Sequence, residues 1–402
     1  MTSRTARHRR FALFVSQVAK SPGRVVYYSS MRSRNPFVTQ GYIDPAHFCD
    51  REVETRQLLD DLSNGRHVTL MAPRRYGKSG LIQHALRTPE ADCVFVYADL
   101  LATTNQADFV RVFANAVVGA LDSRLEKAAS TFAAFFKSVR PKMKADSDGG
   151  VSFSFEVAET SSEATLEQVF DYLAKKRSCE IVVALDEFQQ VAFYPGKGTE
   201  ALLRSRIQFM PPNVHFVFAG SQMHLMGEIF ASPKRPFYQS TTFLTLDVIS
   251  KETYRTFAAR FFADDRRAFA AEAFDALYDR FDGITWYVQA VLNEVWATGG
   301  GLTDVGQVER AVANLVQRRS LTFHDLDVSQ SDSARTLLRA VASAGPVAAP
   351  TAADFIAQSG LRAPSTVAGA LKQLLANELL YKTPTGYVVH DRLFGEYLRN
   401  CP

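Results

Sequence analysis

The residues whose types and spacing could do chemistry begin with the stretch MAPRRYGKSGLI, residues 71–82. An apolar run precedes it and a helical pattern follows it. The order approximates the phosphate-binding loop G-x-x-x-x-G-K-[ST], in which backbone N–H groups and the positive end of a helix converge on phosphate oxygens. The candidate nucleotide-contacting residues are Ala72, Pro73, Arg74, Arg75, Tyr76, Gly77, Lys78, Ser79 and Gly80.

Within this loop each position has an expected task. Gly77 lets the backbone approach the phosphates closely, Lys78 bridges the β- and γ-phosphates of ATP, and Ser79 places its hydroxyl on Mg²⁺. Ala72 stands where the pattern has its first glycine, which costs strain only if that position needs a positive φ. Pro73 lacks an N–H, but it stands early in the loop. The sequence therefore predicts a working phosphate cradle with one tolerated substitution.

A second polar pair ends the apolar run IVVALDEFQQV, residues 181–191. In P-loop ATPases the strand beside the loop ends in this way. We expect Asp186 to hold the Mg²⁺ shell and Glu187 to act as the catalytic residue that activates the attacking water. An isolated Asp-Glu pair would ordinarily be a solvated strand end, so the assignment depends on the loop upstream.

A third polar group follows the apolar run FVFAGSQMHLM, residues 216–226. Ser221 and Gln222 stand where a sensor of the γ-phosphate would be, and either could fill that role. The alternative interpretation is a simple strand-to-loop cap.

The elements that must position these groups alternate along the chain. Five short apolar runs are typical of buried parallel strands and cover residues 67–72, 93–100, 181–186, 214–220 and 243–248. Helical patterns cover residues 51–63, 78–87, 107–121, 165–177 and 199–209. This alternation predicts an α/β core over 36–250, a P-loop NTPase parallel sheet with helices on both faces. Segment 122–164 fits poorly, and its end reads as a small hairpin or a mobile insertion.

Helical periodicity dominates after residue 250 and predicts an all-α lid over 251–325. A polar stretch at 325–334 is interpreted as a linker. Residues 330–402 then show three helical patterns and a hairpin pattern, which is the layout of a winged helix-turn-helix.

Bulk composition separates the N-terminal end from the rest. The formal net charge is +4, yet residues 1–34 hold eight Lys and Arg and no acid. Subtracting eight from +4 leaves the remaining chain at −4. We expect residues 1–35 to be a disordered basic tail or the product of a misassigned start, with Met31 as the true start. Binding to nucleic acid or anionic lipid, and a transit peptide, are the alternatives.

The cysteines and the hydropathy point to a cytoplasmic protein without a membrane span. Cys49, Cys93, Cys179 and Cys401 are scattered without zinc spacing, which suits a reducing compartment. No apolar run approaches the ~18 residues that a membrane helix needs.

Taken together, these motifs resemble the archaeal-type ATPase family, an AAA+/STAND branch of the P-loop ATPases that also occurs in bacteria. The resemblance covers roughly residues 36–400. It rests on four segments in the family's order, namely residues 48–82, 181–191, 220–240 and 281–295. It implies an ATPase core, a helical lid and a winged helix, with ATP and Mg²⁺ bound between core and lid.

The resemblance also implies roles for two arginines outside the loop. Arg51, in FCDRE, lies beside the adenine pocket, and Arg235, in PKRPFYQS, is a catalytic candidate at the γ-phosphate. A solvated loop arginine is the other interpretation of Arg235. The chain departs from the pattern at Gln239-Ser240 and in the segment GITWY, 283–287, where relatives carry arginines. These departures predict slow hydrolysis and leave ATP binding unaffected.

The winged helix leaves two partners open. Its second helical pattern, 364–380, offers few polar or basic groups for a DNA groove, namely Ser365, Thr366, Lys372, Gln373 and Asn377, with Arg362 and Lys382 nearby. The first hypothesis is a slow ATPase switch whose residues 330–402 contact DNA. The second is a signalling or scaffold ATPase whose winged helix and lid dock a protein partner. The oligomeric state stays open.

Overall fold

The computed structural model describes residues 35–87, 93–121, 140–145, 151–157, 159–196 and 198–400. The expectations for the basic tail and for Met31 therefore lie outside the described residues. Among the helices that are described, none is both long enough and apolar enough to cross a bilayer.

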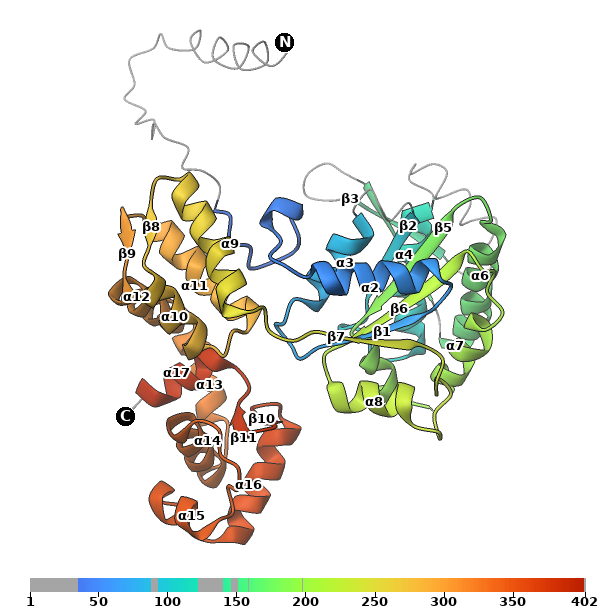
Figure 1. Cartoon of the computed structure of the whole chain (residues 1–402). Helices are drawn as coiled ribbons and strands as arrows, with labels where there is room; N and C mark the ends of the chain where they lie inside the picture. Colours follow the sequence, from blue (N-terminus) through green and yellow to red (C-terminus); the bar gives the residue numbers. More distant parts are fainter. Residues whose placement is uncertain are drawn as a thin grey trace, which may run out of the picture. The chain divides into compact units, whose positions relative to one another are not determined.

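A five-stranded parallel sheet forms the centre of the α/β core (Figure 1). Its strand order is β2-β5-β6-β1-β7. The strands are β1 (Val68–Met71), β2 (Cys93–Asp99), β5 (Glu180–Asp186), β6 (Val214–Gly220) and β7 (Thr242–Thr245). All pair in parallel. The five apolar runs of the sequence are thereby confirmed as strands.

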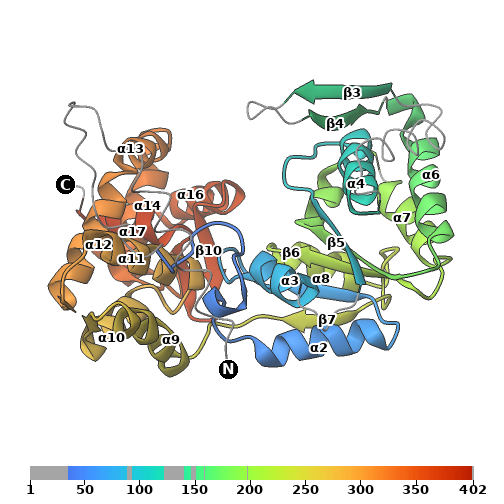
Figure 2. The same ribbon diagram turned by 90° about the horizontal axis from the view of Figure 1, so that it is seen from above.

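Helices cover both faces of this sheet, as the side-chain alternation of β5 shows. Ile181, Val183 and Leu185 pack with α4 and α6, whereas Val182 and Ala184 pack with α2 and α3. Figure 2 shows α2 and α4 on opposite sides of the strands. The core helices are α2 (Glu52–Ser63), α3 (Lys78–Arg87), α4 (Gln106–Leu121), α6 (Ser162–Lys175), α7 (Thr199–Ile207) and α8 (Met223–Ala231). Because both faces are buried, the central strands β1, β5 and β6 read as continuous apolar runs.

The poorly fitting segment contains a two-stranded antiparallel hairpin. Its strands are β3 (Arg140–Ala145) and β4 (Val151–Glu156). The hairpin interpretation is confirmed for these strands, and residues 122–139 lie outside the described part of the chain. Short 3-10 helices are η1 (Pro45–His47), η3 (Glu159–Ser161) and η4 (Phe188–Phe193).

The region after the sheet is helical, as expected. It contains α9 (Lys251–Asp264), α10 (Ala271–Arg280), α11 (Thr285–Thr298) and α12 (Val305–Gln317). Two very short strands that the sequence did not predict, β8 (Ala268–Phe269) and β9 (Leu302–Thr303), pair in parallel between these helices.

The expected polar linker at 325–334 is wrong. Its first four residues belong to α13 (Ser320–Val328), and its last three open α14 (Asp332–Ala344). Asp327 made the stretch look solvated, but this side chain is buried and pairs with Arg339 at 2.7 Å. Phe323 of the same helix is buried too, in an apolar core that runs on into the winged helix. Lid and winged helix therefore share one core.

The three-helix-and-hairpin layout is confirmed. It comprises α14, α15 (Ala353–Ser359), α16 (Pro364–Ala376), β10 (Leu380–Thr383) and β11 (Gly386–Val389), followed by α17 (Arg392–Asn400). Val347 forms an isolated antiparallel β-bridge with Tyr387 of β11 and so adds a third strand position to the hairpin. Gly386 allows this close approach, because a Cβ there would lie 2.7 Å from the Val347 carbonyl oxygen.

Candidate nucleotide site

Strand order brings the predicted polar groups to one edge of the sheet. β5, β6 and β1 are neighbours and run parallel, so their carboxyl ends meet. Asp186 ends β5, Ser221 follows β6, and the loop 72–77 follows β1 before α3 begins at Lys78. The fold thus places the phosphate loop beside the acidic pair.

Alanine at position 72 causes no backbone strain, because this position does not have the positive φ that favours glycine. Its side chain is fully buried in the core between the sheet, α2 and α3, and its N–H donates to the Gly220 carbonyl at 3.4 Å. Within the loop, positive φ angles occur at Arg75 (74°) and Gly77 (94°) instead. Ala72 is also not among the residues that line the cavity, whereas residues 73–80 are. The substitution thus lies behind the loop and outside its cavity-lining part, residues 73–80.

Lys78 and Asp186 form a buried ion pair at the start of α3. The Lys78 ammonium hydrogen-bonds the Asp186 carboxylate and lies 3.3 Å from Glu187 Oε1. Burial alone would lower the pKa of Lys78, but Asp186 and Glu187 outweigh it and the pKa is raised. For Asp186, burial opposes ionisation, yet the Lys78 charge and hydrogen bonds keep its pKa below the usual value. Both groups are therefore charged at neutral pH.

Two hydroxyl groups complete the surroundings of Asp186. The Ser79 hydroxyl and the Tyr97 hydroxyl, the latter at 2.7 Å, both donate to Asp186 Oδ2. Carboxylate and hydroxyl oxygens are ligands that Mg²⁺ accepts, usually alongside phosphate oxygens and water. No group of three or more His, Cys, Asp or Glu side chains with metal-binding geometry occurs in the described part of the chain. The donor set thus suits a cation held jointly with a phosphate, by Ser79 and Asp186.

Glu187 stands in a left-handed conformation, with φ 54°, directly after β5. Its Oε2 accepts hydrogen bonds from Ser221 Oγ at 2.7 Å and from Gln189 Nε2. The carboxylate is thereby fixed between the loop lysine and the end of β6.

The sequence reasoning missed Tyr97 and Gln189. Gln189 lies inside the motif LDEFQ, and its position two residues after Glu187 was the available signal. Tyr97 is on β2, opposite Ala184 of β5. Nothing in the local pattern marks it, because its role depends on which strand lies beside β5.

Arg51 and Arg235 are both engaged by protein groups. Arg51 is buried and donates to Glu54 at 2.7 Å and to the Tyr76 carbonyl at 3.3 Å. Arg51 lines the cavity, but through these contacts its guanidinium group holds the backbone of the loop in place. Arg235 pairs with Glu200 and, at 3.3 Å, with Glu228. It is not among the residues that line the cavity, and the structure does not bring it to the other predicted groups.

The side chains of Arg74 and Arg75 reach across to the helical part of the chain. Arg74 pairs with Glu378, after α16, at 2.9 Å. The guanidinium of Arg75 lies 4.9 Å from the ring centre of Trp286 and 4.7 Å from that of Tyr287, both on α11, and pairs with Asp391 at 2.8 Å. The loop is therefore in contact with both lid and winged helix.

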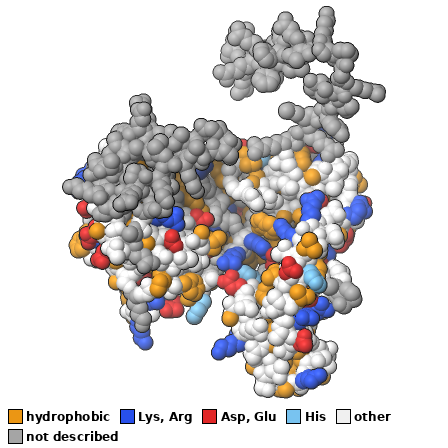
Figure 3. All heavy atoms as spheres, turned by 180° about the vertical axis from the view of Figure 1, so that it is seen from behind, with side chains coloured by type: hydrophobic (Ala, Val, Ile, Leu, Met, Phe, Trp, Pro, Cys, Tyr) orange, Lys and Arg blue, Asp and Glu red, His pale blue; other side chains and the backbone are white. Residues whose placement is uncertain are grey.

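A large cavity joins these parts. Its volume is about 1510 Å³, above the roughly 300–1,000 Å³ of ordinary ligand sites. The space-filling view shows a hollow in the surface of the molecule, with Lys and Arg side chains at its edge (Figure 3). Besides the phosphate loop, residues 38–43, Phe48, Trp286 and His390 line it. A nucleotide of several phosphates fits such a space.

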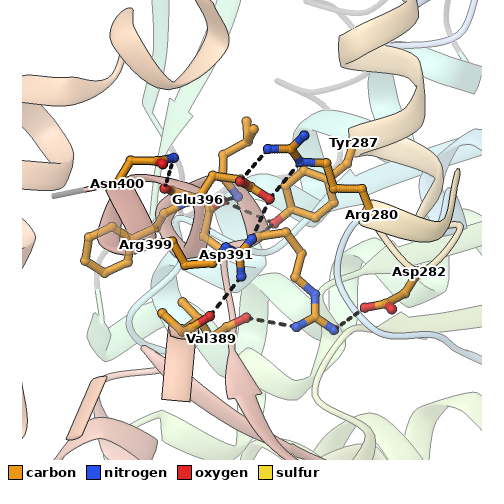
Figure 4. A network of polar contacts seen from close by, with 12 residues as sticks. Arg280, Asp282, Tyr287, Val389, Asp391, Glu396, Arg399 and Asn400 are labelled. Atoms are coloured by element: carbon orange, nitrogen blue, oxygen red, sulfur yellow. Dashed lines mark hydrogen bonds and ion pairs between the residues drawn. The ribbon is translucent and has the colours of Figure 1, made fainter. Parts of the chain in front are cut away.

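A polar network fastens the winged helix to the lid (Figure 4). Arg280 of α10 makes a two-pronged contact with Glu396 of α17, at 2.9 and 2.7 Å. Arg392 pairs with Asp282 at 2.7 Å. Glu396 is nearly inaccessible to solvent. Lid and winged helix are thus joined by a buried ion pair as well as by their shared core.

Solved structures share this fold at low sequence identity. The Walker-type ATPase PABY2304 of Pyrococcus abyssi superposes with a TM-score of 0.61 at 19% identity, covering 90% of this chain and 99% of that one. The ORC2 protein of Aeropyrum pernix, in ADPNP-ADP complexes, gives 0.57 at 16% identity, covering 91% and 95%. The ORC1 protein of Aeropyrum pernix in complex with DNA gives 0.50 at 15% identity, covering 88% and 93%. No curated protein matches the chain.

Family profiles match two separate stretches of the chain. The family described as "Probable winged helix domain" matches residues 321–400. The family described as "ATPase domain predominantly from Archaea" matches residues 48–291, which include the phosphate loop, the Asp186-Glu187 pair and the start of the lid. This chain belongs to the family of ATPase domains found predominantly in Archaea, and it carries a winged-helix domain after its lid.

Proposed function

We propose that this protein binds ATP with Mg²⁺ at the edge of β1, β5 and β6, hydrolyses it slowly, and uses the nucleotide state to reposition its winged helix. One observation carries the proposal. Lys78, Ser79, Asp186, Glu187 and Ser221 converge at one edge of the sheet, beside a cavity that lid and winged helix also line.

Each residue has a task that its surroundings support. The Lys78 charge and the N–H groups at the start of α3 would neutralise and orient the phosphates. Ser79 and Asp186 would hold Mg²⁺, which when bound offsets phosphate charge. Glu187, fixed by Ser221 and Gln189, would orient a water and accept its proton.

Slow turnover is part of the proposal. An arginine at the γ-phosphate is worth about 10³–10⁵ in rate in related chemistry. The four arginines proposed for the nucleotide, Arg51, Arg74, Arg75 and Arg235, are all paired within the chain. The contact proposed for Arg235 at the γ-phosphate thus gains no support and remains a prediction.

The winged helix is the proposed output. The ORC1 relative in fold is solved in complex with DNA, and the start of α16, where helix-turn-helix proteins read bases, is exposed here at Ser365 and Thr366. We therefore propose DNA as the partner of residues 330–402. A docked protein is the second candidate, favoured by how few basic residues surround α16.

Calorimetric titration with Mg-ATP tests the nucleotide site. Lys78→Ala removes the central cation, and we expect binding to weaken by about 30-fold or more, as for the loss of one partner of a buried charge pair. Lys251→Ala is the matched control, because this lysine on α9 pairs with Asp279 and does not line the cavity. Equal affinities for wild type and Lys78→Ala, with both proteins folded, would refute the proposed site.

A further inference from the structure

A carboxylate of the winged-helix domain reaches the phosphate side of the cavity. Glu378 follows α16 in a left-handed conformation, with φ 54°. Its Oε1 accepts a hydrogen bond from Gln222 Nε2 at 2.6 Å, and its Oε2 pairs with Arg74 at 2.9 Å. One carboxylate thus takes a donor from the end of β6 and a donor from the phosphate loop.

Both donors come from segments that belong to the proposed nucleotide site. Gln222 is adjacent to Ser221, whose hydroxyl contacts the proposed water-orienting Glu187. Arg74 lies in the loop between β1 and α3. An amide N–H and a guanidinium donate equally well to a carboxylate and to a phosphate oxygen.

Resting on the proposed function, we propose that Glu378 competes with the γ-phosphate of ATP for Gln222 and Arg74. A diphosphate lacks the competing group and leaves the contact in place. A triphosphate takes the donors and frees Glu378, which loosens the winged helix from the core. The contact of Glu378 with Gln222 and Arg74 is therefore broken when ATP binds and kept when ADP binds, and we call it the latch.

The strength of the contact suits an exchangeable latch. The Arg74 and Glu378 side chains are 40% and 38% exposed, and ion pairs of this exposure add little to stability. The Arg280–Glu396 contact between lid and winged helix is buried on the glutamate side, with Glu396 only 4% exposed. Release of Glu378 thus removes one of two ion pairs between the loop and the winged helix. The Arg75–Asp391 pair and the attachment to the lid stay in place.

Nucleotide affinities of three proteins test the latch. Wild type, Glu378→Gln and Asp354→Asn are titrated with ADP and with a non-hydrolysable ATP analogue. Asp354, on α15, is exposed and does not line the cavity, so its variant loses the same charge from the same domain. We expect Glu378→Gln to bind the triphosphate about three- to tenfold more tightly while ADP affinity stays within about twofold. Asp354→Asn should change neither affinity.

Amide hydrogen exchange of wild type supplies a second readout that needs no variant. The analogue, and not ADP, should speed exchange in the segment 377–380, because only the triphosphate frees Glu378. Unchanged triphosphate-to-diphosphate selectivity in Glu378→Gln, or equal exchange with both nucleotides, would overturn the latch. If Lys78→Ala still loses binding in that case, the proposed ATPase site stands. If wild type binds neither nucleotide, both proposals fail.

Discussion

At the scale of residues, the loop arginines serve a purpose that their motif does not specify. In the sequence pattern, Arg74 and Arg75 occupy positions of a phosphate cradle. In the structure, their guanidinium groups contact Glu378, Trp286, Tyr287 and Asp391. These two side chains of the loop therefore hold the helical part of the chain, which leaves the loop backbone for the phosphates that we propose there.

Arg75 gives the first prediction at this scale. Arg75→Ala removes the cation from two aromatic rings and from Asp391, and should lower the free energy of unfolding by about 1–3 kcal/mol. Arg111→Ala is the matched control, since Arg111 forms a similarly half-buried pair with Asp108 three residues earlier on α4. The control should lose no more than about 0.5 kcal/mol. Equal losses in denaturant titrations of the two variants would show that the stacked contact adds nothing.

The sequence predicted that the groups proposed for the phosphate side would lie together, and the structure places them together. Lys78, Ser79, Asp186 and Glu187 follow strands that could be recognised as apolar runs, and parallel strands end together. The partner of Arg75 could not be predicted in this way. Asp391 lies 316 residues further along the chain, and only the packing of lid and winged helix brings it to the loop.

At the scale of elements, α17 is the piece that ties the winged helix to the lid. The Glu396 carboxylate forms ion pairs with Arg280 of α10 and with Arg399 of its own helix. Burial opposes ionisation of Glu396, yet these guanidinium groups outweigh it and hold its pKa below the usual glutamate value. A carboxyl with a lowered folded-state pKa stabilises the fold above its unfolded-state pKa, and this contribution is lost as pH falls through the folded value.

The lowered folded-state pKa of Glu396 predicts how the stability of the protein depends on pH. Glu396→Gln should be less stable than wild type at pH 7, and the gap should shrink as pH falls below the ordinary glutamate pKa of about 4.3. Glu309→Gln is the control, because Glu309 is half exposed and meets the same Arg280. Urea unfolding at pH 7 and pH 3 measures both. A gap for Glu396→Gln that is the same at both pH values would contradict the account.

Element prediction failed where polar residues are buried. Strands and helices of the core followed from apolar periodicity, but 325–334 was interpreted as a linker. The acidic residues of that stretch suggested solvent, and the sequence alone did not show that Asp327 meets Arg339. A buried ion pair and an exposed charge look alike until the opposing helix is known.

At the scale of the whole molecule, the question is what the winged helix contacts. The exposed basic residues around α16 are Arg362, Lys372 and Lys382. Three phosphate contacts would give a log–log salt slope of about −2.7 for duplex binding.

Duplex retention at several salt concentrations tests this prediction. Lys372→Ala should make the slope shallower by about one and weaken binding for every sequence alike. Lys251→Ala, a lysine of the lid, should leave the slope unchanged. A missing or salt-independent retention of DNA would favour the docked protein instead.

The most direct measurement of the central claim is ATP hydrolysis by wild type and Glu187→Gln under Mg²⁺, with ATP binding measured on both. The account predicts slow turnover by wild type. It predicts that Glu187→Gln still binds ATP, because Lys78 and Ser79 remain, and loses about 10²–10⁴ of the rate, the usual contribution of a general base. Equal hydrolysis by the two proteins, or no hydrolysis by wild type with or without DNA, would contradict the claim that this chain is an ATPase whose catalysis depends on Glu187.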